Sequence, residues 1–230
     1  MDDRGQEPAL EIPELLARHE TVATAMSRFE KLYYFADPMC SWCYGFGPAL
    51  AEFAARHADL PLSVVMGGLR PYTKDPAADK QKADIRGHWR HVEEASGLPF
   101  NDARLMKPGF IYDTEPACRA VVTARETGHA DVLGFMKAVQ AAFYRDARDV
   151  TDAEVLADIA AEKGMDRAAF LAAFRSEEMG DAVRGDFAWT QSVGIRGFPA
   201  LCAARGNELH PVVNGYAPID AVEQGFARLV

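Results

Sequence analysis

The chain has few cysteines, no excess of basic charge and no long apolar run. Its 4 cysteines, unevenly spaced, do not resemble the disulfide framework of a small secreted module. The formal net charge of −9, with Lys and Arg scattered, argues against nucleic-acid binding, which draws on clustered basic side chains. No stretch reaches the length of a membrane span, and the N-terminus lacks the basic start and apolar run of a secretory signal. We therefore expect a cytoplasmic protein without a membrane or nucleic-acid partner.

The composition that remains is that of a globular protein. With 230 residues, of which 49% are hydrophobic and 26% charged, the chain can bury a large core without disulfide bonds. The apolar runs 32–36 and 62–66 indicate buried strands, and residues 49–58 between them indicate a helix. A strand, helix and strand of this length predict a right-handed crossover with parallel strands.

Helical patterns replace strand patterns from about residue 75 to residue 193. Helix starts are indicated by Pro116 and by Thr151 with Glu154 three residues later, which is the pattern of a capping box. Gly97, Gly128 and Gly164 mark helix ends. The helices are expected within 79–95, 115–126, 131–147, 152–164, 166–176 and 178–194.

Strand character returns at residues 199–204 and 210–214, and a last helix is expected over 218–229. Both ends of the chain would then complete one sheet. The predicted organisation is an N-terminal extension (1–29), a sheet domain formed by 30–74 and 194–230, and a helical insert domain (75–193).

Cys40 and Cys43 stand out in the stretch DPMCSWCYGF, which follows the first predicted strand. At a helix start the free N–H groups and the positive end of the helix dipole stabilise a thiolate, so we expect Cys40 to be the nucleophile. Cys43 lies one turn deeper on the same face, where it can resolve a mixed disulfide formed at Cys40. Zinc binding and a pair of inert core cysteines are the alternatives, although Cys118 and Cys202 are isolated and are expected in the core.

A strand, C-x-x-C at a helix start, a second strand, a large helical tract and a late Gly-Phe-Pro-Ala together resemble the thioredoxin superfamily, specifically its DsbA-like branch. DPMCSWCYGFGP is similar to cytosolic predicted disulfide isomerases related to the FrnE group. The resemblance covers roughly residues 30–230. It implies an α/β, thioredoxin-like fold with a large all-helical insertion, and a thiol-disulfide oxidoreductase or disulfide isomerase.

The resemblance also implies roles for single residues. Cys40 would attack and Cys43 would resolve, while Ser41 and Trp42 tune the reduction potential. Phe198–Pro199 occupies the place of a cis-proline bond that faces the cysteine pair and presents backbone groups to an extended client peptide. Phe198 is bulky where many members carry a small or β-branched residue, which would narrow the choice of client.

Protein or small-molecule disulfides are the expected partners, with no metal and no bound cofactor, and with glutathione as a candidate electron donor. Two other functions remain open. Kappa-type glutathione transferases and 2-hydroxychromene-2-carboxylate isomerases are similar in fold but typically use a serine to activate glutathione, whereas Ser41 lies between the cysteines and not at the position of Cys40. A binding module with an apolar groove around Trp42 and Phe198 is the third interpretation.

Overall fold

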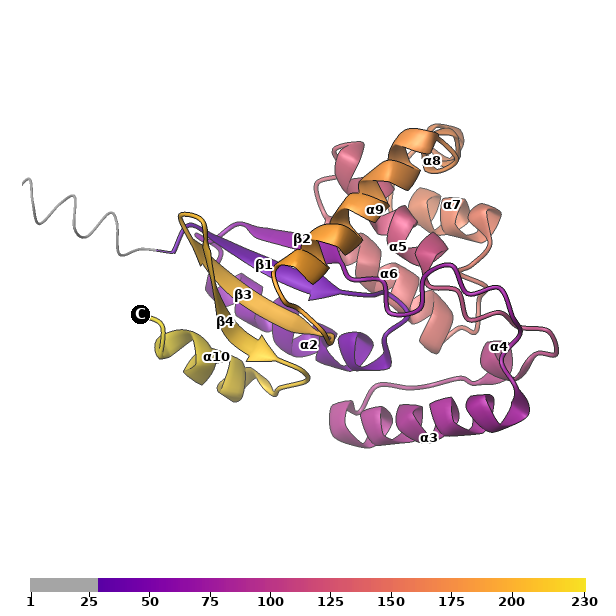
Figure 1. The fold of residues 1–230 in the computed structure, drawn as a ribbon, viewed down its shortest axis with the longest axis horizontal. Coiled ribbons are helices and arrows are strands. Elements are labelled where there is room, and N and C mark those ends of the chain that lie inside the picture. Colours follow the sequence, from indigo (N-terminus) through magenta and orange to yellow (C-terminus); the bar gives the residue numbers. More distant parts are fainter. Residues whose placement is uncertain (1–28) are drawn as a thin grey trace, which may run out of the picture.

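The computed structural model describes residues 29–230, so the predicted extension lies outside the described part except for its last residue. Four strands form one mixed sheet in the order β2-β1-β3-β4 (Figure 1). β1 pairs in parallel with β2 and antiparallel with β3, and β3 and β4 form an antiparallel hairpin. The two ends of the chain therefore complete one sheet, as predicted. The strands are β1 (Lys31–Ala36), β2 (Leu62–Met66), β3 (Ala200–Arg205) and β4 (Glu208–Asn214).

Helices cover both faces of this sheet because the side chains of β1 alternate between two apolar layers. Leu32 and Tyr34 join the main core with α2 (Ser41–Arg56), against which α10 (Ile219–Ala227) packs. Phe35 points to the other layer, where its ring lies 5.2 Å from that of Trp189 on α9 (Glu177–Ser192). Figure 1 shows α9 on the side of the sheet opposite α2.

The segment between β2 and β3 is helical among the described residues, as the sequence predicts. α5 packs against α6, α8 and α9, and α3 packs against α2. Besides α9, the helices of this segment are α3 (Asp79–Ser96), α4 (Ala103–Met106), α5 (Glu115–Glu126), α6 (Val132–Tyr144), α7 (Ala153–Glu162) and α8 (Arg167–Phe174). None of the helices within residues 29–230 has both the length and the apolar character needed to cross a membrane.

Two local details differ from the sequence-based expectation. The one-turn helix α4 was not predicted, because four residues are too few to show a helical period. The prediction that Thr151 opens a capping box was wrong, because Asp152 caps α7 by accepting a hydrogen bond from the Glu154 N–H. The Thr151 hydroxyl instead donates to Asp149 Oδ1 at 2.6 Å.

Candidate active site

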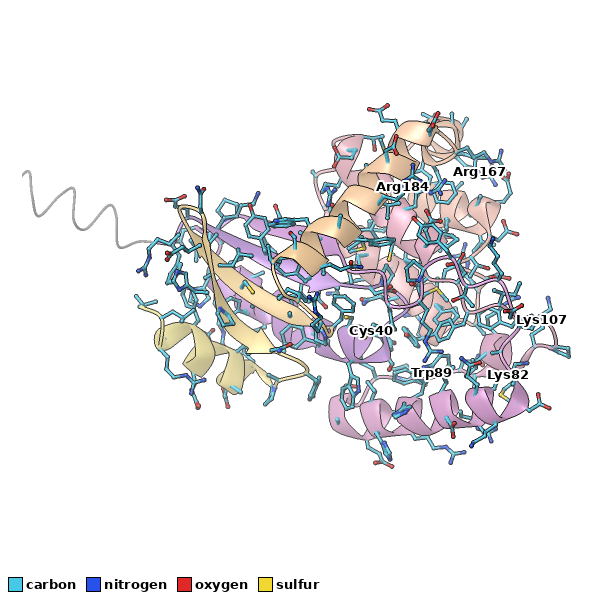
Figure 2. All side chains as sticks on the ribbon, in the orientation of Figure 1. Cys40, Lys82, Trp89, Lys107, Arg167 and Arg184 are labelled. Carbon is cyan, nitrogen blue, oxygen red and sulfur yellow. The ribbon has the colours of Figure 1, made fainter. Side chains whose placement is uncertain are left out.

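Cys40 immediately precedes α2, at the position predicted from the sequence. Its backbone is extended, and its N–H donates to the Asp37 carbonyl at 3.0 Å, which closes a tight turn after β1. Only 6% of Cys40 is exposed, and its Sγ lies 3.6 Å from the Phe198 carbonyl oxygen. Figure 2 shows Cys40 where the sheet meets the helices that follow β2. Cys40 therefore stands directly before the first turn of α2, whose N–H groups have no partner within the helix.

Cys43 lies one turn further into α2 and is fully buried. Burial raises the pKa of the Cys43 thiol, and the hydrogen bond to the Cys40 thiol and the nearby charges of Cys40 and Asp37 raise it further. Cys43 thus stays protonated at neutral pH. The two sulfurs are neighbours with different surroundings, one at the surface of a cavity and one beneath it.

The Phe198–Pro199 peptide bond is cis, and the loop that contains it lies across from Cys40. The Pro199 carbonyl accepts a hydrogen bond of 2.7 Å from the Gly215 N–H, which fixes this loop to the end of β4. The Phe198 ring rests on the backbone of Gly67, just after β2, where an added Cβ would lie 1.9 Å from ring atom Cζ. Only glycine fits there with the ring in this position.

A cavity of about 350 Å³ opens beside Cys40. Four residues singled out from the sequence line it: Cys40, Ser41, Trp42 and Phe198. Cys43 and Pro199 lie outside its lining. The remaining lining residues come from α3 and from the loops before α2, after β2, before α5 and before β3. Sequence reasoning assigned none of them to the site: Met39, Leu69, Arg70, Ile85, His88, Trp89, Tyr112 and Gly197.

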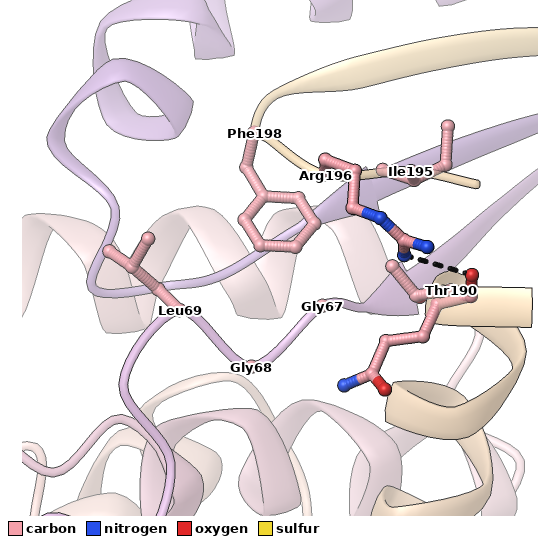
Figure 3. A pocket seen from close by; sticks show the side chains of 8 residues that line it. Gly67, Gly68, Leu69, Thr190, Ile195, Arg196 and Phe198 are labelled. Carbon is pink, nitrogen blue, oxygen red and sulfur yellow. Dashed lines mark hydrogen bonds between the residues drawn. The ribbon is translucent and has the colours of Figure 1, made fainter.

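A second cavity of about 280 Å³ lies on the far side of Phe198 (Figure 3). Figure 3 shows the Phe198 ring over the Gly67–Gly68 segment and the Arg196 side chain directed to the end of α9, where it donates to the Gln191 carbonyl at 3.0 Å. Leu69 and Phe198 line both cavities and form the ridge between them. The exposed fraction of Leu69 is 41%, so this ridge presents an apolar surface to solvent.

Asp37 is a buried residue of the site that the sequence reasoning did not assign. Its carboxylate accepts hydrogen bonds from the Met39 N–H at 2.8 Å and from the Leu69 N–H at 2.7 Å. The Cys118 thiol, expected only as a core group, is buried and lies 3.4 Å from the same carboxylate. Burial raises the pKa of Asp37 against the lowering effect of these hydrogen bonds. The signal was in the motif itself, because Asp37 opens the turn that carries Cys40.

Tyr112 was also missed, since nothing in its local sequence marks it. Its hydroxyl donates to the Met39 carbonyl at 2.6 Å and lies 3.5 Å from the Tyr144 hydroxyl. Burial raises the pKa of Tyr112, so the phenol stays protonated and holds the residue before Cys40 in place.

The other candidate groups lie apart from this site or are not assembled into one. Cys202 is on β3 in the apolar layer of Phe35, and burial raises its pKa to about 11. Across residues 29–230, no group of three or more His, Cys, Asp or Glu side chains is placed to hold a metal ion. All four cysteines are free thiols.

Comparisons with known proteins agree with this geometry. A candidate protein disulfide isomerase from Nitrosomonas europaea is 35% identical, with a TM-score of 0.82 over 87% of this chain and 97% of that one. The cytosolic disulfide reductase DsbM from Pseudomonas aeruginosa has the same fold at 24% identity, with a TM-score of 0.73 over 86% of this chain and 98% of its own. DsbM has also been solved with GSH.

A curated relative is more distant. The ClpXP adapter protein SpxH from Halalkalibacterium halodurans is 23% identical over 171 residues, which is 72% of this chain and 55% of that protein. The chain thus spans about half the length of this relative. The sequence pattern of the DSBA-like thioredoxin domain matches residues 31–227, nearly the whole described part. With the C-x-x-C pair at the start of α2 and the cis-proline loop opposite, the chain belongs to the DSBA-like thioredoxin domain family.

Proposed function

We propose that the protein is a thiol-disulfide oxidoreductase that reduces or isomerises disulfides of client proteins through Cys40 and Cys43. The observation that carries this proposal is the unequal placement of the two thiols. Cys40 borders the cavity at a helix start, whereas Cys43 is buried one turn below with a raised pKa. Such a pair suits an attacking and a resolving sulfur.

The reaction consists of two exchanges. The Cys40 thiolate attacks one sulfur of the client disulfide, forms a mixed disulfide and releases the other client sulfur, which takes up a proton. Cys43 then gives up its proton and attacks Cys40 Sγ, which releases the client as a thiol and leaves a Cys40–Cys43 disulfide. Two electrons pass from the cysteine pair to the client. In isomerisation, a second client thiol resolves the mixed disulfide instead, and the pair stays reduced.

Glutathione is the proposed electron donor, and the cytoplasm is the proposed compartment. Two glutathione molecules would return the oxidised pair to thiols and leave as glutathione disulfide. The structure of DsbM with GSH supports this choice, because that protein is a cytosolic reductase with the same fold. A glutathione transferase or isomerase without redox chemistry is less well supported, since a cysteine occupies the position before α2 and a second thiol lies behind it.

The proposal is tested by trapping clients in cells. The Cys43→Ser variant should accumulate mixed disulfides with cellular proteins, because the first exchange still occurs and the resolving thiol is gone. Cells are quenched with acid, and the proteins are compared on non-reducing and reducing gels.

The Cys40→Ser variant is the matched control and should trap little. A glutathione transferase would form no protein adducts, and a binding module would retain its partners equally in both variants without a difference on reduction. If Cys43→Ser shows no dithiothreitol-sensitive adducts above the Cys40→Ser background, oxidoreduction of protein clients is wrong and glutathione chemistry takes its place.

A further inference from the structure

Arg70 lines the same cavity as Cys40. Within residues 29–230 its guanidinium makes no ion pair, and its Nη1 is shielded from solvent without a hydrogen-bond partner. Leaving a buried donor unpaired is costly, and a charged one more so. Arg104 also has one buried nitrogen, Nε, without a partner, but its charge is met by the Asp149 carboxylate at 2.8 Å. An unpaired guanidinium beside a nucleophilic sulfur calls for an anionic ligand.

The position of Arg70 is fixed by neutral groups. The backbone N–H of Arg70 donates to Thr114 Oγ1 at 3.1 Å, and the backbone carbonyl of Arg70 accepts from the Thr114 N–H at 3.3 Å. The guanidinium lies over the Tyr112 ring, 5.2 Å from the ring centroid. These contacts orient the side chain without neutralising its charge, so the cation is preorganised for a ligand.

The rest of the cavity matches a small ligand that carries negative charge. Among the described residues, no Asp or Glu lines it, and His88 from α3 adds a second basic side chain. Asp37, the nearby buried carboxylate, is engaged by the N–H groups of Met39 and Leu69 and is not part of the lining. Trp42 and Trp89 provide apolar walls on which an aliphatic chain can pack, and Figure 2 shows Trp89 on α3 below Cys40.

Building on the proposed oxidoreductase function, we propose that this cavity binds small thiols and disulfides that carry a carboxylate near their sulfur, and that Arg70 binds this carboxylate. The planar guanidinium can hold it through two parallel hydrogen bonds. The ligand's sulfur then meets Cys40. With a disulfide RSSR, Cys40 forms Cys40–S–S–R and releases RS⁻; Cys43 displaces the second RS⁻ and the Cys40–Cys43 disulfide forms. Two electrons pass to the ligand, and the protons of the two thiols end on two RSH.

The test is the rate at which the reduced protein is oxidised by three disulfides of similar size and different charge. The anionic probe is dithiodipropionate, the neutral one is bis(hydroxyethyl) disulfide, and the cationic one is cystamine. Wild type should react fastest with dithiodipropionate after correction for the intrinsic reactivity of each disulfide with a free thiol. Arg70→Met should slow this reaction by about tenfold or more, which is ~1.4 kcal/mol in the barrier, and should slow the neutral probe by a clearly smaller factor.

Two further variants separate recognition from general charge. Arg70→Lys keeps the charge without the planar fork and should retain part of the preference. Arg196→Met removes a positive charge from the cavity beyond Phe198 and should leave the preference intact. The inference is wrong if Arg70→Met slows all three probes equally, or if wild type shows no charge preference. A protein that reacts with none of the three would contradict the proposed oxidoreductase function itself.

Discussion

At the scale of single residues, the site places three buried acidic groups, one carboxyl and two thiols, near the sulfur of Cys40, which borders the cavity. Burial raises the pKa of Asp37, Cys43 and Cys118. The Cys118 thiol lies within hydrogen-bond distance of the Asp37 carboxylate. Asp37 also holds the turn that carries Cys40, through the Met39 N–H. The carboxylate is therefore a structural group whose charge opposes folding.

Asp37→Asn should change how stability depends on pH. The pKa of Asp37 is raised above 3.8 in the folded protein, so the folded state binds more protons than the unfolded state, and the free energy of unfolding falls as pH rises from about 4 through the folded pKa. The asparagine variant lacks this decrease. We expect the stability of wild type relative to the variant to fall as the pH rises above about 4, where an unperturbed aspartate titrates, and to level off above the folded pKa.

Urea unfolding at several pH values measures this difference. Asp75→Asn, which replaces an exposed carboxylate in the loop before α3, corrects for the loss of one negative charge. A difference between wild type and Asp37→Asn that stays constant with pH would contradict the assignment.

At the scale of elements, the loop before β3 is held against the end of β2. The Phe198 ring packs on Gly67, and the Phe198 carbonyl lies 3.6 Å from Cys40 Sγ. Contact between two loops therefore sets the distance between the cis-proline loop and the Cys40 sulfur. The pocket beyond it depends on the same ring. The position of the Phe198 ring therefore depends on residue 67 being glycine.

Gly67→Ala should displace Phe198 and slow disulfide exchange. A methyl group would meet the ring at 1.9 Å, so the loop must move, with an expected loss of about 1–3 kcal/mol in the free energy of unfolding. Urea unfolding and the rate of reaction with a neutral disulfide measure both effects.

The control is Gly185→Ala on α9, where an added Cβ meets no atom within 4 Å. This change should stabilise the helix by about 0.4–1 kcal/mol and leave the exchange rate unaffected. Adding Phe198→Ala to Gly67→Ala should recover part of the lost stability, because the clash is gone. Unaltered stability and rate in Gly67→Ala would contradict the contact.

At the scale of the whole molecule, one ion pair connects the sheet to the helices that follow β2. Arg125 on α5 binds Asp186 on α9 through two hydrogen bonds of 2.8 and 2.9 Å. Asp186 also accepts from the Met66 N–H, and Arg125 donates to the Val64 carbonyl. Two helices and β2 therefore share one pair of charges.

Asp186→Ala should lower the free energy of unfolding by about 2–4 kcal/mol, because it leaves Arg125 and the Met66 N–H without their partner. The Arg125 side chain is 27% exposed, so the loss should be smaller than for a fully buried pair. Asp181→Ala on the same helix breaks an exposed pair with Arg184 and should change the free energy of unfolding far less. Equal losses in the two variants, measured by urea unfolding, would argue against this role of Asp186.

Local sequence patterns predicted most elements because each depends on neighbours in the chain. The predicted bounds of α5 and β2 match the structure, and the position of Cys40 followed from a strand followed by a helix. The contacts of Asp37 with Leu69 and Cys118 join residues 32 and 81 positions apart, and no local pattern encodes them. Arg70 was not predicted as a site residue for the same reason, because Thr114, which holds its backbone, lies 44 positions further along the chain.

The closeness of Cys40 to Phe198 has a consequence for synthesis of the protein. The two residues are 158 positions apart, so the ribosome makes the C-x-x-C pair long before the loop that covers it. At about 5–20 residues per second, this interval is roughly 8–30 s. β1 must also wait for β3, its antiparallel neighbour, and has only β2 to pair with until then. During this time the nascent chain carries both thiols of the C-x-x-C pair without the cis-proline loop, so under the proposed function these thiols could react before the loop that would select clients is made.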